Sequence, residues 1–210
     1  MVYLPPAFTE TRADVLIAHI EHHDFGLLVS QGPQGMIASQ IPFLVEQRDD
    51  GRVYLLGHLA RQNPQVADLD GVSEALAIFQ GPHAYISPSW YAAGPSVPTW
   101  NYASVHAYGT VRSIADPSWL RVLLQRLSER HEAREPGGPW RMGDQPEPYL
   151  ASMLNGIVGV EIAVERLEGK FKLSQNRPTV DRPRIIAALE RRDSSESRAV
   201  AQLMREREPL

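Results

Sequence analysis

The chain has 210 residues, 43% of them hydrophobic, which is enough for one domain with a substantial core. Its 21 Lys and Arg against 25 Asp and Glu leave a net charge of −4, which excludes a bulk electrostatic attraction to nucleic acid or anionic lipid. The absence of cysteine excludes disulfides, thiolate metal sites and a cysteine nucleophile. Neither a secretion signal nor a long apolar run is present, so we expect a soluble cytoplasmic protein without a membrane partner.

The first half of the chain predicts one helix followed by strands. Thr11 and Asp14 form a possible capping box, so a helix is expected over about residues 12–22. Three strand-like runs follow, FGLLVSQ, MIASQIPFLVEQ and RVYLLGHLA, separated by turns at 32–35 and 48–51. We expect these runs to form an antiparallel meander. A short helix is then expected to begin at Asn63 and Pro64, because Asn is a good N-cap and Pro suits the first helical position.

The second half predicts three more strands and three helical segments. The run EALAIFQGPHAYI is interrupted at Gly81 and Pro82, which indicates a bulge or an edge position. The run TWNYASVHAYGTVRSI alternates regularly, and a leucine stripe after Asp116 predicts a helix down to about residue 131. After a short helix ending near residue 155, the run IVGVEIAVERLEGKFK predicts a half-buried strand with Val158 inward and Glu161 outward.

These elements predict an α+β protein that is mainly β, of the antiparallel barrel type, because about six short strands alternate irregularly with a few helices. Residues 1–180 are assigned to the barrel domain. Residues 181–210 are assigned to a C-terminal helical extension of the same domain. This extension carries seven Arg and six Asp and Glu, so we expect a solvated amphipathic helix and not a basic arm.

Three histidines share one predicted helix. His19, His22 and His23 have a spacing that metal sites use. Histidines in a last helical turn also interact favourably with the helix dipole, and no carboxylate is placed beside them as a further ligand. We therefore predict no metal site.

The segment Gly57–Gln65 is a candidate anion site. A strand end is followed at once by polar donors and a helix start, and Arg61 could make a bidentate contact with a phosphate. The alternative is an ordinary capped helix with a surface arginine.

Aromatic residues bracket the loop AAGPSVP, with Trp90 and Tyr91 before it and Trp100 and Tyr102 after it. They could stack on a flat ligand, or they could belong to a core or a dimer interface. The chain has only two lysines, Lys170 and Lys172, and they lie close together. The segment KLSQNR, which begins at Lys172, is either a pocket wall or a solvent-facing strand end.

Five segments in this order resemble the PaiB family of FMN-binding negative transcriptional regulators, within the flavin-binding split-barrel group. They are MVYLPPAF, GHLARQNPQ, AIFQGPHAYISPSWY, VPTWNYASVHAYG and KFKLSQNR, and together they run over nearly the whole chain. The resemblance implies a six-stranded antiparallel split β-barrel with flanking helices. It also implies a homodimer with FMN at the subunit junction.

The resemblance further implies cofactor-binding residues. The phosphate end of FMN would meet His58, Arg61 and Asn63, with polar contacts from Lys172, Ser174 and Gln175. Trp100 and Asn101 would lie near the isoalloxazine ring. No catalytic residue and no metal ligand is implied. The sequence offers one candidate phosphate site and contains no dinucleotide-binding fingerprint, which favours FMN over FAD.

Three functions stay open at this point. The family name implies regulation of protease production and sporulation genes, whereas many split-barrel relatives are flavin oxidoreductases that use NAD(P)H. A third possibility is haem binding, with His19, His22, His23 or His106 as axial ligands. DNA as a direct partner is supported neither by the charge nor by a helix-turn-helix pattern.

Overall fold

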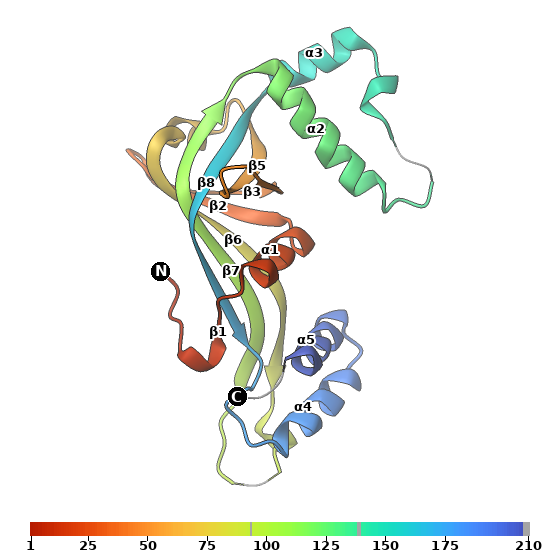
Figure 1. The fold of residues 1–210 in the computed structure, drawn as a ribbon. Helices are drawn as coiled ribbons and strands as arrows, with labels where there is room; N and C mark the ends of the chain where they lie inside the picture. The colour runs from red at the N-terminus through yellow and green to blue at the C-terminus, as the bar shows by residue number, and fades with distance from the viewer. Residues whose placement is uncertain (93, 138–139, 208–210) are drawn as a thin grey trace. The chain divides into compact units, whose positions relative to one another are not determined.

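The computed structural model describes residues 1–92, 94–137 and 140–207 (Figure 1). The strands are β1 Thr9–Glu10, β2 Phe25–Gly32, β3 Gly35–Pro42, β4 Leu44–Gln47, β5 Val53–Ala60, β6 Asp70–Ile86, β7 Thr99–Ile114 and β8 Ile157–Lys172. The α-helices are α1 Ala13–His22, α2 Pro117–Glu132, α3 Glu147–Asn155, α4 Asp181–Glu190 and α5 Ser195–Glu206. The short 3₁₀ helices are η1 Pro6–Phe8, η2 Pro64–Asp68, η3 Pro88–Trp90 and η4 Met142–Asp144.

The chain divides into two compact units. Unit 1 consists of Met1–His19, Gln80–His106 and Glu168–Leu210. Unit 2 consists of Ile20–Phe79 and Ala107–Leu167. The long strands β6, β7 and β8 each contribute residues to both units. Both units are therefore assembled from segments that are far apart in the sequence.

The strands form one sheet in the order β3-β2-β6-β7-β8-β5-β4, with β1 paired to β8. Both predicted turns are confirmed: β2 and β3 form one antiparallel hairpin, and β4 and β5 form another. Gly35 and Gly51 have φ values of 97° and 78°, which favour glycine at these turns. The predicted meander is wrong, however, because β5 pairs with β8 and the two hairpins lie at opposite ends of the strand order.

The break in the meander falls at Pro42 and Phe43, where the sequence predicted one continuous strand. Pro42 has no N–H to offer to a further ladder bond. The N–H of Phe43 donates to the carbonyl of Asp24 at 2.8 Å, and the Phe43 side chain is fully buried. The run MIASQIPFLVEQ is therefore two strands, each with a different partner.

The interruption at Gly81 and Pro82 does not end β6. The pairing between β2 and β6 covers only Leu76–Ile78, so Pro82 lies beyond it and its missing N–H removes no bond to β2. Gly81 is needed for close packing, because a Cβ there would lie 2.5 Å from Cε1 of His19. The expected edge-like position is thus confirmed locally in a strand that is otherwise central.

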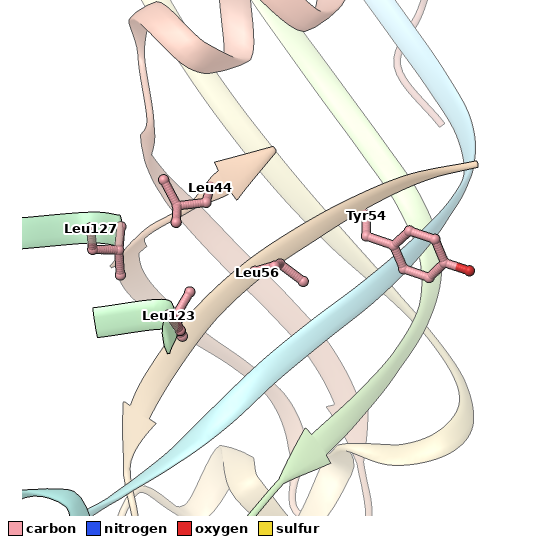
Figure 2. Close-up of a cluster of buried hydrophobic side chains, with 5 residues drawn as sticks. All are labelled: Leu44, Tyr54, Leu56, Leu123 and Leu127. Atoms are coloured by element: carbon pink, nitrogen blue, oxygen red, sulfur yellow. The ribbon is translucent and has the colours of Figure 1, made fainter. Parts of the chain in front are cut away.

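Helix α2 covers one face of the β4–β5 hairpin in unit 2 (Figure 2). Leu123 and Leu127 from α2 pack with Leu44, Tyr54 and Leu56 from the two strands. The helix begins as predicted, because the carboxylate of Asp116 accepts from the N–H of Ser118 at 2.9 Å. The predicted leucine stripe is the buried face of this helix.

The C-terminal segment differs from the prediction of one solvated helix. It forms two helices, α4 and α5, which lie side by side in unit 1 (Figure 1). Ile185 and Leu189 of α4 and Val200 of α5 are fully buried. Residues 208–210 of the predicted extension lie outside the described residues. The two helices therefore contribute side chains to the core of unit 1 and are not a solvated surface helix.

The predicted alternation of β8 is also wrong at Glu161. Glu161 was expected to face outward, but its side chain is only 3% exposed. Its carboxylate accepts hydrogen bonds from Arg48 at 2.6 Å and from Arg112 at 2.7 Å. Arg48, from the turn after β4, and Arg112 of β7 therefore make a buried position acceptable for a charged residue.

The predicted class, α+β and mainly β with antiparallel pairing, is confirmed, although the described sheet has eight strands and not six. Within the described ranges, no helix combines the length and the apolar character needed to cross a membrane.

Candidate functional site

The predicted cofactor-binding residues fall into two sets, one in each unit. His58, Arg61 and Asn63 belong to unit 2. The set in unit 1 is Trp100, Asn101, Lys172, Ser174 and Gln175. Each set has its own geometry and is described by itself.

Arg61 in unit 2 is exposed but already engaged. Its Nε donates to the carbonyl of Asn155 and its Nη2 to that of Ile157, both at 2.8 Å. Its backbone N–H donates to Gly156 at the same distance. Arg61 thus ties the end of β5 to the junction between α3 and β8. Only Nη1 makes no hydrogen bond within the described part of the chain, so this nitrogen is the one available to an anion.

Asn63 caps η2 as the sequence predicted. Its Oδ1 accepts from the N–H of Gln65 at 2.9 Å, and its Nδ2 donates to Ser39 at 2.9 Å. The amide of Gln65, which is fully buried, donates to Leu28, Ser30 and Ile37. These bonds fix the turn after β5 against the β2–β3 hairpin. They occupy both polar groups of the Asn63 side chain.

His58 is half-buried on β5, and burial lowers its pKa. Its Nδ1 is buried and has no hydrogen-bond partner among the described residues. A neutral imidazole can donate or accept one hydrogen bond but brings no positive charge. In unit 2, Arg61 is therefore the predicted residue that could offset the charge of a phosphate.

Asn101 and Ser174 form a reciprocal buried pair in unit 1. The Asn101 amide donates to Ser174 Oγ at 3.0 Å, and this hydroxyl is 3.1 Å from Oδ1 of Asn101. Nδ2 of Asn101 also lies 3.4 Å from the sulfur of Met204 on α5. Asn101 is fully buried, whereas Trp100 is 52% exposed, because neighbouring residues of a strand point to opposite faces. Asn101 thus lies in the interior of unit 1 beside Ser174, and its contact with the flavin ring stays a prediction.

The turn after β8 has an unusual backbone. Ser174 has a φ of 60°, in the left-handed region that non-glycine residues rarely adopt. Gln175 supports this turn, because its Oε1 accepts from the N–H of Leu173 at 2.7 Å and its Nε2 donates to the carbonyl of Phe171 at 2.5 Å. Ser174 and Gln175 are both buried, so they shape the turn and do not line an open surface.

Arg182 holds the same turn from α4, and the sequence analysis missed it. Its guanidinium donates to the carbonyls of Leu173 at 2.7 Å and of Met204 and Arg207 at 2.6 Å. It is 5% exposed, and burial lowers its pKa. Three carbonyls, two of them from the C-terminal end of α5 where the helix dipole favours a cation, thus stabilise a buried charge.

Lys172 is the charged member of this set, and it keeps a donor for a ligand. Its ammonium donates to Thr99 Oγ1 and, at 2.6 Å, to the carbonyl of Trp100, which leaves one of its three donors. Burial, and then the charges of Arg177 and Lys170, lower its pKa. The ammonium is therefore partly buried and has two other cations near it, and a bound anion would favour its charged form.

Trp100 lies on an exposed aromatic face of unit 1. The rings of His83 and Tyr85 on β6 lie 6.1 and 6.0 Å from it. A shallow hollow of ≈ 510 Å³ is lined by Gln80, His83, Trp100 and Tyr102. The ammonium of Lys170 lies 5.7 Å from the ring of Tyr102.

This face fits a flat ligand that carries an anionic group. Exposed rings on β6 and β7 supply an apolar contact surface, and the lysines of β8 supply positive charge. Strand alternation could have placed Lys170 with Lys172 on one side of β8. The contributions of His83 and Tyr85 could not be predicted, because they depend on the pairing of β6 with β7.

The histidines considered as haem or metal ligands are dispersed between the units. His19 is buried in unit 1, with its ring 5.3 Å from that of Phe171. The rings of His22 and His23 lie 4.8 Å apart in unit 2, and His106 is half-buried in unit 1. Among the residues that the structure describes, no group of three or more histidines or carboxylates could hold a metal ion.

Comparisons with known proteins add to this geometry. A family model described as "Putative FMN-binding domain" matches residues 2–166. "Protease synthase and sporulation protein PAI 2" of Bacillus subtilis is 34% identical over 207 residues, covering 98% of each chain. The "FAD and Heme binding protein" of Mycobacterium smegmatis has a TM-score of 0.55 at 16% identity, over 78% of this chain and 73% of that one. A conserved hypothetical protein of Mycobacterium tuberculosis also has a TM-score of 0.55, at 17% identity over 84% and 94% of the two chains. These two structures share the fold alone.

Proposed function

Because this chain belongs to the family described as "Putative FMN-binding domain", its cofactor is FMN or a related flavin, and we propose that it is a flavin-binding regulatory protein. The regulatory part of the proposal rests on the name of the Bacillus subtilis relative and on the PaiB motifs in the sequence. A bound flavin supplies redox chemistry by itself. The residues of this chain would bind it, orient it and shield it from water.

The observation that carries the proposal is the exposed aromatic face of unit 1 beside two lysines. Trp100 and Tyr102 would contact the ring system of the flavin. Lys172, with one free donor, would hold the phosphate. Asn101, Ser174 and Gln175 would act indirectly, by fixing the turn that follows Lys172. In unit 2, Nη1 of Arg61 is a second candidate for the phosphate.

We expect FMN to bind more tightly than riboflavin, because only FMN carries the phosphate. Lys172→Gln should weaken FMN binding by roughly 1.5–3 kcal/mol, the range for a charged hydrogen bond, and leave riboflavin binding nearly unchanged. Titration followed by flavin fluorescence measures both affinities. Equal affinities of the parent protein for FMN and riboflavin would contradict a phosphate site.

Arg61→Gln is the matched variant for the other candidate. A selective loss of FMN affinity in this variant, with Lys172→Gln unaffected, would assign the phosphate to unit 2. Because Arg61 also bonds two backbone carbonyls, its thermal unfolding must be measured alongside. Arg134→Gln, an exposed position on unit 2, controls for the loss of one positive charge.

We further propose that regulation depends on the state of the flavin and not on a DNA-reading helix. The net charge of −4 and the sequence, which has no helix-turn-helix pattern, support this. FMN-loaded protein should therefore bind a promoter fragment weakly at physiological salt, and binding at low salt should fall as salt rises. Gel shifts over a salt series check this. A salt-resistant complex that prefers one sequence would make direct repression the better explanation.

The protein is also proposed to act as a homodimer. Val97 and Trp100 in unit 1 are large apolar side chains with 70% and 52% exposure, and Val122 in unit 2 is 57% exposed. Such surfaces are commonly covered by a second copy. We expect sedimentation equilibrium at micromolar concentration to give twice the monomer mass. A monomer mass would refute this part of the proposal.

A further inference from the structure

A second hollow of unit 1 is lined by residues of η3, of α4 and of the α4 C-cap, and it shares no described lining residue with the hollow beside Trp100. It has a volume of ≈ 300 Å³ and is lined by Ser89, Trp90, Arg184, Ala187, Ala188 and Arg191. This size is at the lower end of the range for small-molecule sites. The two alanines form its floor, since their short side chains leave space above the helix.

The charge of this hollow is positive. Arg184 of α4 and Arg191, the residue that caps this helix, are seven residues apart. Arg191 keeps the helical backbone conformation, so the two lie on one face, on either side of the alanines. Among the described residues that line the hollow, none is a carboxylate. The nearby acidic residues Glu190 and Asp193 are paired with Arg205 and Arg198.

Arg191 is available to a ligand, because its side chain makes no hydrogen bond or ion pair within residues 1–92, 94–137 and 140–207. Arg184 uses only its Nε, which donates to the carbonyl of Trp90 at 3.0 Å, so its two terminal nitrogens remain. Arginine nitrogens of this kind bind phosphate oxygens in pairs.

Trp90 adds an aromatic surface to the lining of the hollow. Arg184 holds its carbonyl, and the guanidinium of Arg192 lies 6.0 Å from the centre of its ring. Arg192 in turn donates to the carbonyl of Tyr85 at 3.3 Å. An indole beside two free guanidinium ends can contact a flat ring while the arginines bind its phosphate.

We propose that this hollow binds a free mononucleotide, with the phosphate on Arg184 and Arg191 and the base against Trp90. Nothing in the proposed flavin function requires this site. It would give the flavin protein a second small-molecule ligand, held by α4 and η3.

The test uses FMN-loaded protein and calorimetric titration with AMP and with adenosine. We expect AMP to bind about tenfold or more tightly than adenosine, and Arg191→Glu to weaken AMP binding by at least about tenfold, since charged hydrogen bonds to the phosphate are lost. FMN absorbance and thermal unfolding should not change in this variant. Arg134→Glu, at an exposed position of unit 2, is the control for the same change in charge.

Several results would overturn the proposal. They are AMP binding that Arg191→Glu leaves intact, adenosine binding as tightly as AMP, and inorganic phosphate binding as tightly as AMP. Displacement of FMN by AMP would also overturn the proposal, because the two ligands would then share one site. Binding of a single-stranded oligonucleotide without binding of AMP would rule out a free nucleotide. If the parent protein does not bind FMN, the flavin proposal is contradicted. The test of this hollow still stands, because AMP can also be titrated into the flavin-free protein.

Discussion

Replacing Arg182 by Met is expected to destabilise the protein by about 3 kcal/mol or more. Methionine fills a similar volume but leaves three carbonyls without their donor, and each unsatisfied buried polar group costs about 1–3 kcal/mol. These carbonyls belong to Leu173, Met204 and Arg207. Chemical denaturation at equilibrium, followed by circular dichroism, measures the free energy of unfolding.

The matched control is Arg198→Met on α5, which makes the same change at a side chain with 54% exposure. It should alter the free energy of unfolding by no more than about 0.5 kcal/mol, the usual range for surface substitutions. Arg182→Lys should lie between, because lysine retains the charge but not the planar fork of donors. If Arg182→Met were as stable as the control, the guanidinium would not be holding the turn.

Gly109→Ala should be the most damaging small substitution in β7. A Cβ at this position would lie 2.0 Å from the carbonyl oxygen of Ala163 on β8 and 2.8 Å from its carbon. Both are backbone atoms, so no side chain can rotate away and the two strands must separate locally. We expect a loss of about 3 kcal/mol, the upper end for overpacking, and a lower melting temperature in a thermal scan.

Gly143→Ala supplies the comparison, because no atom lies within 4 Å of the Cβ that it would add. Its stability should stay within about 0.5 kcal/mol of the parent protein. A melting temperature of Gly109→Ala equal to that of Gly143→Ala would mean that β7 and β8 are not packed as closely as described.

Local signals in the sequence were sufficient for the elements that depend on neighbouring residues. The helix starts at Asn63 and Asp116 follow from capping side chains, and the hairpin turns follow from glycines at 35 and 51. Strand pairing was not predictable in this way. Alternation shows which residues share a face, but not that β5 pairs with β8, about a hundred residues later in the chain.

The candidate site shows the same limit. The sequence left Trp100 open between a ligand surface and a core position, and the structure shows it 52% exposed. Asn101 beside it is buried because its partner Ser174 comes from a distant turn. Alternation also fails after Lys172, since β8 ends there and the chain turns in a left-handed conformation. Arg182 resembled one of many surface arginines, and only the tertiary structure shows its three buried acceptors.

The division of the chain affects the order in which the units can form during synthesis. All residues of unit 2 precede position 168, whereas unit 1 needs residues 1–19, 80–106 and the segment that begins at 168. Glu10 shows how far this dependence extends: its carboxylate binds Arg12 and Arg207, and Arg12 is the main cause of a pKa lowered to about 2. Because ribosomes add residues from the N-terminus onward, the ion pair between Glu10 and Arg207 cannot form until nearly two hundred more residues have been synthesised. A chain stalled before α4 has all residues of unit 2 and the β8 partner of β1. It lacks α4, α5 and Arg207, so unit 1 stays incomplete and exposed to chaperones and proteases.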